Sequence, residues 1–326
     1  MEIFKEAELR RLVTLNEKVL EVIEEGFTRL SLGQVQTPPI MRIEVPEHNG
    51  EVDIKAARVQ GLGQFAIKVS SGFFDNPARG LRSGSGLMVL LNAETGYPEA
   101  LLMDNGYLTD VRTAAAGAIA AKYLAPERVN TVGIIGAGSQ ARWQLRAVRL
   151  VRSFQQVLVY SQHRDHAEQF ADEMAQDLGI TVIVSDSAEA LVRQSDVVVT
   201  TTPATQPVIQ ASWVHPGLHI TAMGSDAEFK QELDGRILAR ADKACCDLIA
   251  QCRRLGELHH AEEIDPELGN RVMELGDLTA KKLLGRTHPD HVTVCDLTGT
   301  GVQDTMIARY AVERAHSVLG SVTPSR

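Results

Sequence analysis

The sequence has few cysteines and no excess of positive charge. Its four cysteines show neither zinc-finger spacing nor the density of a secreted disulfide scaffold, so we expect reduced thiols in a cytoplasmic protein. The net charge is −9, and no basic block or strand rich in basic and aromatic residues stands out, which argues against nucleic acid as a partner. An acidic protein that handles an acidic metabolite must gather its few cations locally, so inward-facing lysines and arginines are candidates for substrate binding.

Long hydrophobic runs are missing as well. No apolar run reaches the roughly 20 residues that a bilayer span needs, and the first residues are charged, unlike a secretory signal. Internal repeats and low-complexity segments are absent. The chain has 326 residues, 44% of them hydrophobic, which suffices for two globular domains with a substantial core. We therefore expect a cytoplasmic location and no membrane partner.

The most informative motif that is present lies in residues Val129–Ala141. An apolar strand breaks there into Gly136-x-Gly138-x-x-Ala141, and a helical pattern follows. This order places several backbone N–H groups and a helix N-terminus around an anion, because the first glycine permits a tight turn and the second lets a pyrophosphate approach. The motif indicates dinucleotide binding; an ordinary glycine-rich turn of an α/β protein is the alternative.

The part of the chain before this motif has a different pattern. An amphipathic helix is expected over Asn16–Leu32. A second helix, alanine-rich and closely packing, is expected over Leu108–Leu124, with Thr109 as its N-cap. Between them the period of the apolar residues changes to that of strands, separated by glycine, proline and asparagine, which favours an antiparallel sheet. The predicted strands are Met41–Val45, Glu51–Val59, Phe65–Ser70, Gly86–Leu91 and Ala100–Met103.

From residue 131 to about residue 246, strands and helical patterns alternate. This alternation predicts a parallel, doubly wound sheet of the α/β class. Its predicted strands are Thr131–Ile135, Gln156–Tyr160, Thr181–Val184, Val197–Thr200, His219–Met223 and Lys243–Cys246. A last strand at Val292–Cys295 precedes a final helix that runs to about Val318, and periodicity alone does not decide which domain that helix joins.

Four motifs occur in one order along the chain. They are Thr109–Ala115, Gly133–Ala141, the segment Gly224–Asp226 with Lys230–Leu233, and Gly299–Asp304. Together they resemble the ornithine cyclodeaminase/μ-crystallin family of NAD(P)-dependent enzymes over nearly the whole chain. The segments Pro46–Lys55 and Ile67–Pro77 resemble the branch that contains ectoine-utilisation cyclodeaminases and iminosuccinate reductase.

The resemblance implies a domain organisation. In this family a Rossmann domain is inserted into a second, α+β domain that carries substrate residues and forms the dimer. The implied fold is therefore an α/β Rossmann doubly wound parallel sheet, residues 126–299, inserted into a substrate-binding and dimerisation domain, residues 1–125 plus 300–326. A homodimer and a small imino or amino acid substrate are the expected partners.

The resemblance also implies substrate-binding residues. Arg42 matches the arginine that binds the substrate carboxylate, Lys68 matches the lysine beside the reacting carbon, and Arg112 matches the arginine of the Arg-Thr-Ala-Ala helix. Lys68 lies between apolar Ile67 and Val69, where an inward lysine is costly without a partner, and Arg112 lies one turn from a helix start, where anions are favoured. For Arg42 the residues alone would favour an exposed strand arginine.

Asp226 follows a predicted parallel strand, at the edge of the sheet where sites of open α/β sheets form. The resemblance implies that it is catalytic. Either Asp226 or Lys68 would transfer the proton, and a loop-capping aspartate is the alternative. The family usually has Pro-Gly after this aspartate, whereas this chain has Glu228 and Phe229, so the geometry of the loop is open.

Two further residues bear on the substrate. Asp53 matches a position that is acidic in the cyclodeaminases, and Lys55 lies two residues on, on the same strand face, where the family has an apolar residue. An added ammonium suits a second carboxylate and suits the distal amine of ornithine poorly. We therefore expect a dicarboxylate such as iminosuccinate; a solvated Lys55 on an edge strand is the alternative.

The cofactor is expected to be NAD or NADP. The end of the second Rossmann strand, Ser161–Arg164, lacks the carboxylate that NAD enzymes usually place there, and Arg164 would face a 2′-phosphate or be an exposed helix start. The candidate cofactor-binding residues are Thr109, Gly136, Gly138, Ser139, Gln140, Ser161, His163, Arg164, Thr201, Thr202, Pro203, Met223, Gly224, Ser225 and Gly299. No metal site is expected, because neighbouring His259 and His260 point apart and no third ligand has a sensible spacing.

These expectations define a function. We expect an NAD(P)H-dependent oxidoreductase that acts on CH–NH or C=N bonds and reduces a small imino acid, with iminosuccinate to aspartate as the best candidate. One alternative is an ornithine-type cyclodeaminase that uses NAD catalytically. Another is a non-catalytic carrier of a small ligand or NADPH, like the μ-crystallins.

Overall fold

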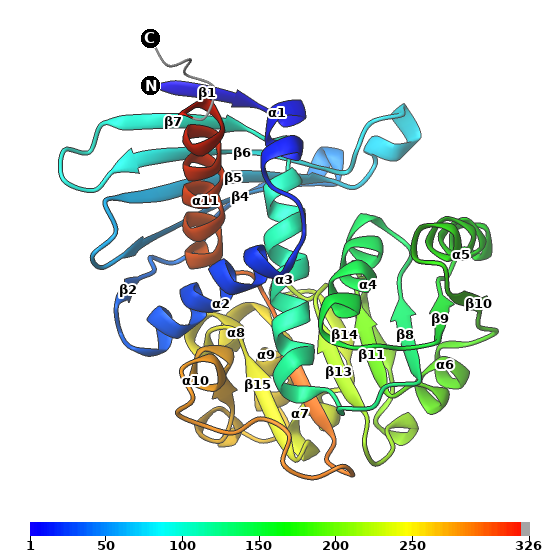
Figure 1. The fold of residues 1–326 in the computed structure, drawn as a ribbon. Coiled ribbons are helices and arrows are strands. Elements are labelled where there is room, and N and C mark those ends of the chain that lie inside the picture. Colours follow the sequence, from blue (N-terminus) through cyan, green and yellow to red (C-terminus); the bar gives the residue numbers. More distant parts are fainter. Residues whose placement is uncertain (321–326) are drawn as a thin grey trace. The chain divides into compact units, whose positions relative to one another are not determined.

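The computed structural model describes residues 1–320, which form two compact units. The first unit comprises Met1–Arg112 and the segment that begins at Thr300; the second comprises Thr113–Gly299 (Figure 1). The division falls within helix α3 (Tyr107–Leu124), whose first turns belong to the first unit. Among these residues, no helix is both long enough and apolar enough to cross a bilayer.

A seven-stranded sheet forms the first unit. Its strands, in the order β1-β7-β6-β5-β4-β2 with β3 also paired to β4, are β1 (Glu2–Lys5), β2 (Val35–Gln36), β3 (Met41–Val45), β4 (Gly50–Val59), β5 (Gln64–Phe73), β6 (Gly84–Asn92) and β7 (Pro98–Met103). The five predicted strands correspond to β3–β7 and pair antiparallel. The expectation of a purely antiparallel sheet is wrong at one edge, because the four-residue strand β1 pairs with β7 in parallel.

Helices α1 (Glu6–Leu12), α2 (Glu17–Ser31) and α11 (Gly301–Gly320) complete the first unit. The final helix, whose place the sequence left open, packs against β4, β5 and α2, and Figure 1 shows it lying across the strands. Its start approaches β4 so closely that an added Cβ on Gly301 would lie 2.3 Å from the carbonyl oxygen of Ala56. The Thr305 hydroxyl donates to the Ala57 carbonyl and accepts from the Ala66 N–H, which fixes α11 to both strands.

The second unit contains an eight-stranded, wholly parallel sheet in the order β10-β9-β8-β11-β13-β17-β15-β16. Its strands are β8 (Thr131–Ile135), β9 (Gln156–Tyr160), β10 (Thr181–Val184), β11 (Val197–Thr200), β13 (His219–Ala222), β15 (Lys243–Cys246), β16 (Met273–Glu274) and β17 (Thr293–Asp296), with β12 (Thr205–Ile209) and β14 (Gln231–Leu233) paired separately. The predicted Rossmann-type sheet is confirmed. Its winding direction reverses between β8 and β11, and such sheets bind ligands beyond the carboxyl ends of the strands at that point.

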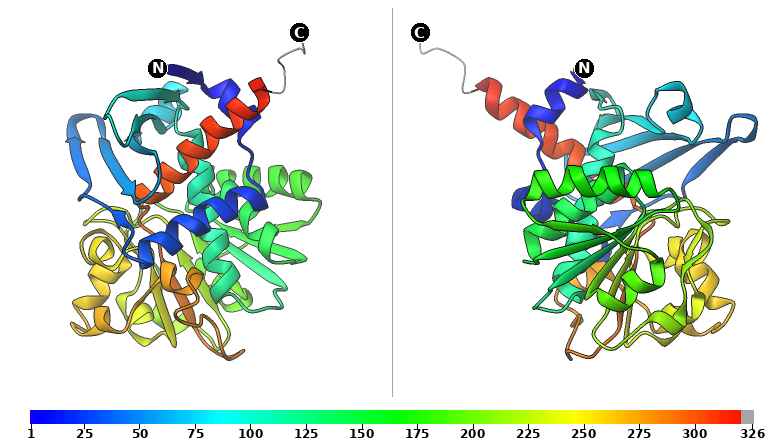
Figure 2. Two further views of the ribbon diagram at one scale, coloured as in Figure 1. Left: turned by 60° about the vertical axis from the view of Figure 1, so that its left-hand side comes forward. Right: turned by 90° about the vertical axis from the view of Figure 1, so that its right-hand side faces the viewer.

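Helices cover both faces of this sheet (Figure 2). They are α4 (Ser139–Val151), α5 (Arg164–Leu178), α6 (Ala188–Gln194), α7 (Gly235–Arg240), α8 (Ile249–Leu255), α9 (Glu257–Glu262) and α10 (Leu275–Thr279). Alternate residues of one strand belong to different cores: Val132 and Ile134 pack with α4 and α5, whereas Ile135 packs with α6, α7 and α9. Burial on both faces explains why these strands read as continuous apolar runs.

Helix α3 starts earlier than the sequence suggested. It begins at Tyr107, so Thr109 lies inside the first turn and its prediction as the N-cap is wrong. The carboxylate of Asp104 accepts the Leu108 N–H at 2.8 Å, and the buried Tyr107 donates its hydroxyl to the Val13 carbonyl at 2.6 Å. The local Asp104 contact and the tertiary Tyr107 contact together outweigh the preference of threonine for the N-cap position.

Candidate active site

A buried cluster of charged side chains lies in the first unit. Lys68 comes from β5, Arg112 from α3 and Asp304 from the first turn of α11, and each is at most 4% exposed. Lys68 Nζ lies 3.1 Å from Asp304 Oδ2, and Arg112 Nε donates to Asp304 Oδ1 at 2.9 Å. Two cations from distant parts of the sequence therefore share one carboxylate.

Lys55 adds a third cation beside them. It pairs directly with Lys68 in the β4–β5 register and is 5% exposed. Since β4 has paired strands on both sides, the alternative of a solvated Lys55 on an edge strand is wrong. Like charges opposite one another destabilise a sheet, so these two buried lysines are unfavourable unless anions compensate them.

The surroundings of Lys68 bring its pKa close to neutral pH. Burial, followed by the charge of Arg112, lowers the pKa of Lys68 to about 7 against the opposing effect of Asp304. Burial raises the pKa of Asp304, but Lys68, Arg112 and Lys55 together hold it below its usual value. Burial also raises the pKa of Asp104 to about 6. A lysine that titrates near neutral pH can exchange a proton with a substrate, and the three cations that act on Asp304 suit an anionic substrate.

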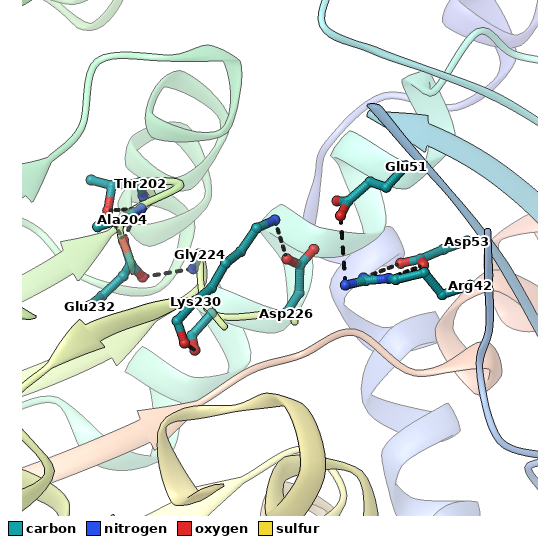
Figure 3. Close-up of polar contacts among 10 residues, drawn as sticks. Arg42, Glu51, Asp53, Thr202, Ala204, Gly224, Asp226, Lys230 and Glu232 are labelled. Carbon is teal, nitrogen blue, oxygen red and sulfur yellow. Dashed lines mark hydrogen bonds and ion pairs between the residues drawn. The ribbon is translucent and has the colours of Figure 1, made fainter. Parts of the chain in front are cut away.

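Arg42 has acidic partners of its own (Figure 3). Its Nε and a terminal nitrogen donate to the two carboxylate oxygens of Asp53 at 2.7 and 2.9 Å, and Nη1 lies 3.6 Å from Glu51 Oε2. The predicted substrate residues Arg42 and Asp53 are thus paired with each other across β3 and β4. Two carboxylates therefore balance the charge of this arginine.

Sequence reasoning recognised the motif that contains Asp304 but gave this residue no role. The signal was available, because Asp304 is the one charged residue of the segment Gly299–Ala308, which makes it a candidate partner for buried cations. What the sequence alone did not supply was the packing of α11 against β4 and β5, which carries the carboxylate to Lys68.

The glycine turn of the second unit has the geometry that a dinucleotide requires. Gly136 has φ +106°, its N–H donates to the Tyr160 carbonyl at 2.9 Å, and an added Cβ would lie 2.6 Å from Thr201 Oγ1. Gly138 is the N-cap of α4, and no protein atom lies within 4 Å of the position of its absent Cβ. Ser139 and Gln140 then open the helix, and the backbone N–H groups of a helix N-terminus favour an anion such as a pyrophosphate.

We predict that Gly138→Ala weakens dinucleotide binding while leaving the free protein stable. The added methyl meets no protein atom, so the melting temperature should stay within about 2 °C of the wild-type value. It would occupy the space through which a pyrophosphate approaches the backbone, and the dissociation constant for NADH should rise at least about tenfold. Fluorescence titration with NADH measures this; an unchanged dissociation constant would contradict the assignment. Gly136→Ala is the comparison, because it should lower stability as well.

The loops after β11 and β13 are joined by a buried glutamate (Figure 3). Glu232 is fully buried and accepts hydrogen bonds from the Thr200 hydroxyl, the Thr202 N–H and hydroxyl, and the Gly224 N–H, at 2.5–2.8 Å. Burial raises its pKa, although these donors oppose the shift. An added Cβ on Gly224 would lie 2.0 Å from the Thr202 carbonyl oxygen, so only glycine allows this approach. The role of Glu232 was missed because its donors lie on other loops.

Asp226 lies in the loop after β13 and forms an ion pair with Lys230, Nζ to Oδ1 2.7 Å (Figure 3). The Asp226 side chain is 36% exposed and that of Lys230 only 6%. Between them, Glu228 and Phe229 occupy a turn closed by the Lys230 N–H and the Ala227 carbonyl at 3.1 Å. The departure from Pro-Gly is therefore accommodated in a tight turn that exposes Phe229.

The other predicted cofactor residues follow different strands. Ser161, His163 and Arg164 follow β9, Thr201 to Pro203 follow β11, Met223 to Ser225 follow β13, and Gly299 follows β17. All of these lie beyond carboxyl ends of parallel strands, whereas Thr109 belongs to the first unit. Arg164 is the first residue of α5, two-thirds exposed, and its Nε donates to Glu168 at 3.0 Å.

The possible metal ligands give a mixed result. The spacing argument against a third ligand is wrong, because ligand atoms of His259, His260 and the exposed Glu263 lie within 4.8 Å of one another. One nitrogen of each imidazole already donates to a backbone carbonyl: His259 to that of Arg253 and His260 to that of Lys230.

The four cysteines are buried, and burial raises the pKa of the Cys246 thiol to about 12, as expected for structural thiols.

The parallel sheet and its glycine turn define a dinucleotide-binding protein. The pattern of the ornithine cyclodeaminase/mu-crystallin family matches residues 2–318, and the chain belongs to that family. It is 49% identical over 317 residues to an uncharacterized cyclodeaminase, y4tK, of Sinorhizobium fredii, which covers 97% of this chain and 96% of the relative.

Three solved structures share the fold. The chain is 30% identical to Thermococcus litoralis Δ1-pyrroline-2-carboxylate reductase in complex with NADH and L-proline, with a TM-score of 0.92 and full coverage of both chains. It is 34% identical to an archaeal alanine dehydrogenase dimer with bound NAD, with a TM-score of 0.89 and coverage of 100% and 98%. It is 31% identical to the iminosuccinate reductase of Paracoccus denitrificans in complex with NAD⁺, with a TM-score of 0.88 and coverage of 98% and 97%. The family match and these relatives together show that the chain is a nicotinamide-dependent oxidoreductase that acts on C–N bonds.

Proposed function

We propose that this protein uses NAD(P)H to reduce a small imino acid to an amino acid, with iminosuccinate to aspartate as the specific reaction. The observation that carries the proposal is the buried cluster in which Lys55, Lys68 and Arg112 all act on the single carboxylate of Asp304. Three buried cations suit a small substrate that carries two carboxylates.

The residues of the cluster have distinct roles in this proposal. The planar guanidinium of Arg112, held by Asp304 through Nε, binds the α-carboxylate, and Lys55 binds the distal one. Lys68 donates a proton to the imine nitrogen, which its lowered pKa permits at neutral pH. The bound reduced nicotinamide supplies the hydride. Asp53 and Glu51 neutralise Arg42, so in this proposal Arg42 has a smaller part in substrate binding than Lys55 and Arg112.

The relatives support this reaction class. Two of the similar solved structures are reductases whose names specify imino acids, pyrroline-2-carboxylate and iminosuccinate. The name of y4tK favours the alternative of a cyclodeaminase. A cyclodeaminase binds a substrate with a distal amine, and the buried Lys55 ammonium would repel that amine.

The same relatives also support a proposal for the cofactor and for the oligomeric state. Similar structures hold NAD⁺ or NADH, and one of them is a dimer, so we propose a nicotinamide cofactor and a homodimer. The residues Ser161–Arg164 contain no carboxylate to repel a 2′-phosphate, so the proposal covers NADH and NADPH alike.

Replacing Lys55 by methionine tests the dicarboxylate assignment. Methionine keeps most of the length of the side chain and removes its charge, so kcat/KM for iminosuccinate should fall about 10- to 100-fold. For the imine of pyruvate, which has no distal carboxylate, kcat/KM should change less than about threefold. Lys18→Met, an exposed lysine of α2, is the matched control and should change neither value. Equal losses for both imines would contradict the role of Lys55.

The function itself is tested by a panel of imino acids made from oxaloacetate, pyruvate and glyoxylate with ammonia or methylamine. Oxidation of NADH or NADPH is followed, and we expect the oxaloacetate-derived imine to give the highest kcat/KM. Release of ammonia from ornithine with only catalytic NAD would instead support the cyclodeaminase. Binding of NADPH without reduction of any imine would support a carrier.

A further inference from the structure

The second unit contains a cavity of about 780 Å³ that the proposed reaction does not use. Its walls are the carboxyl end of α3, the connector Ala125–Arg128, Arg152 at the end of α4, and the segment Arg286–Pro289. The connector leads into β8 and Arg286–Pro289 precedes β17, so the cavity lies at the amino ends of parallel strands. The glycine turn follows the carboxyl end of β8. The cavity is therefore separate from the dinucleotide site.

The lining of this cavity is basic, although the chain as a whole has a net charge of −9. Its ionised side chains are one carboxylate and four cations: Glu127, Lys122, Arg128, Arg152 and Arg286. The lining also includes His288, whose Nδ1 lies 3.8 Å from Asp290 Oδ2. A local excess of positive charge in an acidic protein attracts small anions.

Two of the arginines are held in place by backbone carbonyls. Arg152 Nε donates to the Pro126 carbonyl at 2.8 Å, and a terminal nitrogen donates to the Lys122 carbonyl at 2.9 Å. Arg286 Nε donates to the Leu124 carbonyl at 2.7 Å. These bonds satisfy carbonyls at the carboxyl end of α3. Within residues 1–320, neither guanidinium forms an ion pair with a carboxylate, so their charges are fixed at the cavity without a direct counter-ion.

The two fixed arginines also affect one another. Burial lowers the pKa of Arg286 to about 10; Asp242 opposes this shift and Arg152 adds to it. Burial likewise lowers the pKa of Arg152, against the effect of Glu127. An arginine with a pKa of about 10 is still charged at pH 7, so an anion in the cavity would offset the repulsion between the two.

The other two cations are placed for direct contact with a ligand. Arg128 is exposed, and it forms no hydrogen bond or ion pair with the part of the chain that the structure describes. Lys122 is also exposed, and its ammonium lies 5.3 Å from the centre of the Tyr123 ring. Capping of α3 explains Arg152 and Arg286, but it does not explain why Arg128 lies beside them.

Volume and lining together limit the ligand. Sites for small molecules measure about 300–1,000 Å³, so this cavity suits a metabolite. Arginine and lysine side chains bind phosphate groups, which gather two or more negative charges on neighbouring oxygens. Tyr123, Pro126 and Pro289 add apolar surface for the organic part of such a molecule.

We propose that this cavity is a binding site for a small phosphate-bearing metabolite. Arg128 and Lys122 contact the phosphate, and Arg152 and Arg286 supply fixed positive charge in the wall. The site lies apart from the residues assigned to the cofactor and to the imino acid, so the inference does not rest on the proposed reduction.

Inorganic pyrophosphate is the probe, and isothermal titration calorimetry measures its binding to the intact protein. The protein is first saturated with NAD⁺, so that the glycine turn is occupied. We expect pyrophosphate to bind at least about tenfold more tightly than malonate, a dicarboxylate of similar size. Arg128→Glu should raise the dissociation constant for pyrophosphate at least about tenfold, and Arg128→Gln should raise it less.

Two further variants serve as controls. Arg193→Gln removes an exposed arginine of α6 and should change the dissociation constant less than about twofold. Lys55→Met removes a cation of the first unit and should likewise leave it within about twofold, because the probe does not bind there. Since Arg128 is exposed, its variants should keep the wild-type melting temperature to within about 2 °C.

Several results would overturn the site. They are absence of pyrophosphate binding to the NAD⁺ complex, equal dissociation constants in the wild-type protein and Arg128→Glu, or a loss of affinity in Lys55→Met in place of Arg128→Glu. Equal affinities for malonate and pyrophosphate would overturn the assignment to phosphate. None of these results bears on imine reduction, which is assayed without pyrophosphate.

Discussion

Lys68→Met is expected to lower kcat for imine reduction by about a thousandfold, the range that a well-placed general acid contributes. Methionine fills the same buried volume without an ammonium, so the imine nitrogen loses its proton source. The affinity for NADH should stay within about twofold, because the glycine turn belongs to the second unit. Steady-state kinetics and NADH fluorescence titration provide both values.

The wild-type pH profile should carry the signature of Lys68. Burial and Arg112 lower its pKa to about 7, so the ammonium is present below that pH and is lost as the pH rises through it. We expect kcat to be level below about pH 7 and to fall about tenfold per unit above it. In Lys68→Met this alkaline fall should disappear. If the wild-type protein and Lys68→Met have the same pH profile, another group donates the proton to the imine. Lys18→Met, which changes an exposed lysine, is the control.

Asp304→Asn is expected to lower the free energy of unfolding by about 3–5 kcal/mol, because it leaves Lys68 and Arg112 buried without the carboxylate they share. The cations hold the pKa of Asp304 below its usual value, so this stabilisation is fully present at pH 7 and is lost only when the pH falls through that low value. Urea denaturation at pH 7 measures the loss.

The matched control lies on the same helix. Glu313 pairs with Arg309 at 2.9 Å, but its side chain is 59% exposed, so Glu313→Gln should cost less than about 1 kcal/mol. Activity adds a second readout for Asp304→Asn. Asp304 raises the pKa of Lys68, so its removal should shift the alkaline fall in kcat to lower pH. Equal stability losses in the two variants would show that Asp304 does not compensate buried charge.

The sequence predicted the fold well where apolar periodicity is strong. The strands of the parallel sheet are buried on both faces, and several were placed to the residue, among them Thr131–Ile135 and Gln156–Tyr160. The short strand β1 was missed because its four residues offer only one buried position, Phe4. Thr109 was misplaced as an N-cap because contacts of Tyr107 and Asp104 move the start of α3 toward the N-terminus.

The candidate site was only partly predictable. Lys68 and Arg112 were found through a resemblance in their motifs, and the structure brings both to Asp304. That carboxylate, like Glu232 between its two loops, acts through contacts between segments far apart in the sequence, which local patterns do not encode. The pairing of Arg42 with Asp53 likewise depends on the β3–β4 register.

The stoichiometry of the reaction tests most directly whether the cationic cluster serves imine reduction. Purified protein is given oxaloacetate, ammonia and limiting NADH or NADPH, and oxidised cofactor and aspartate are quantified together. One aspartate formed per cofactor oxidised, with a loss of at least about tenfold in initial rate at subsaturating imine in Lys55→Met, is the predicted result. Ammonia released from ornithine without net oxidation of the cofactor, and no aspartate from oxaloacetate, would contradict it.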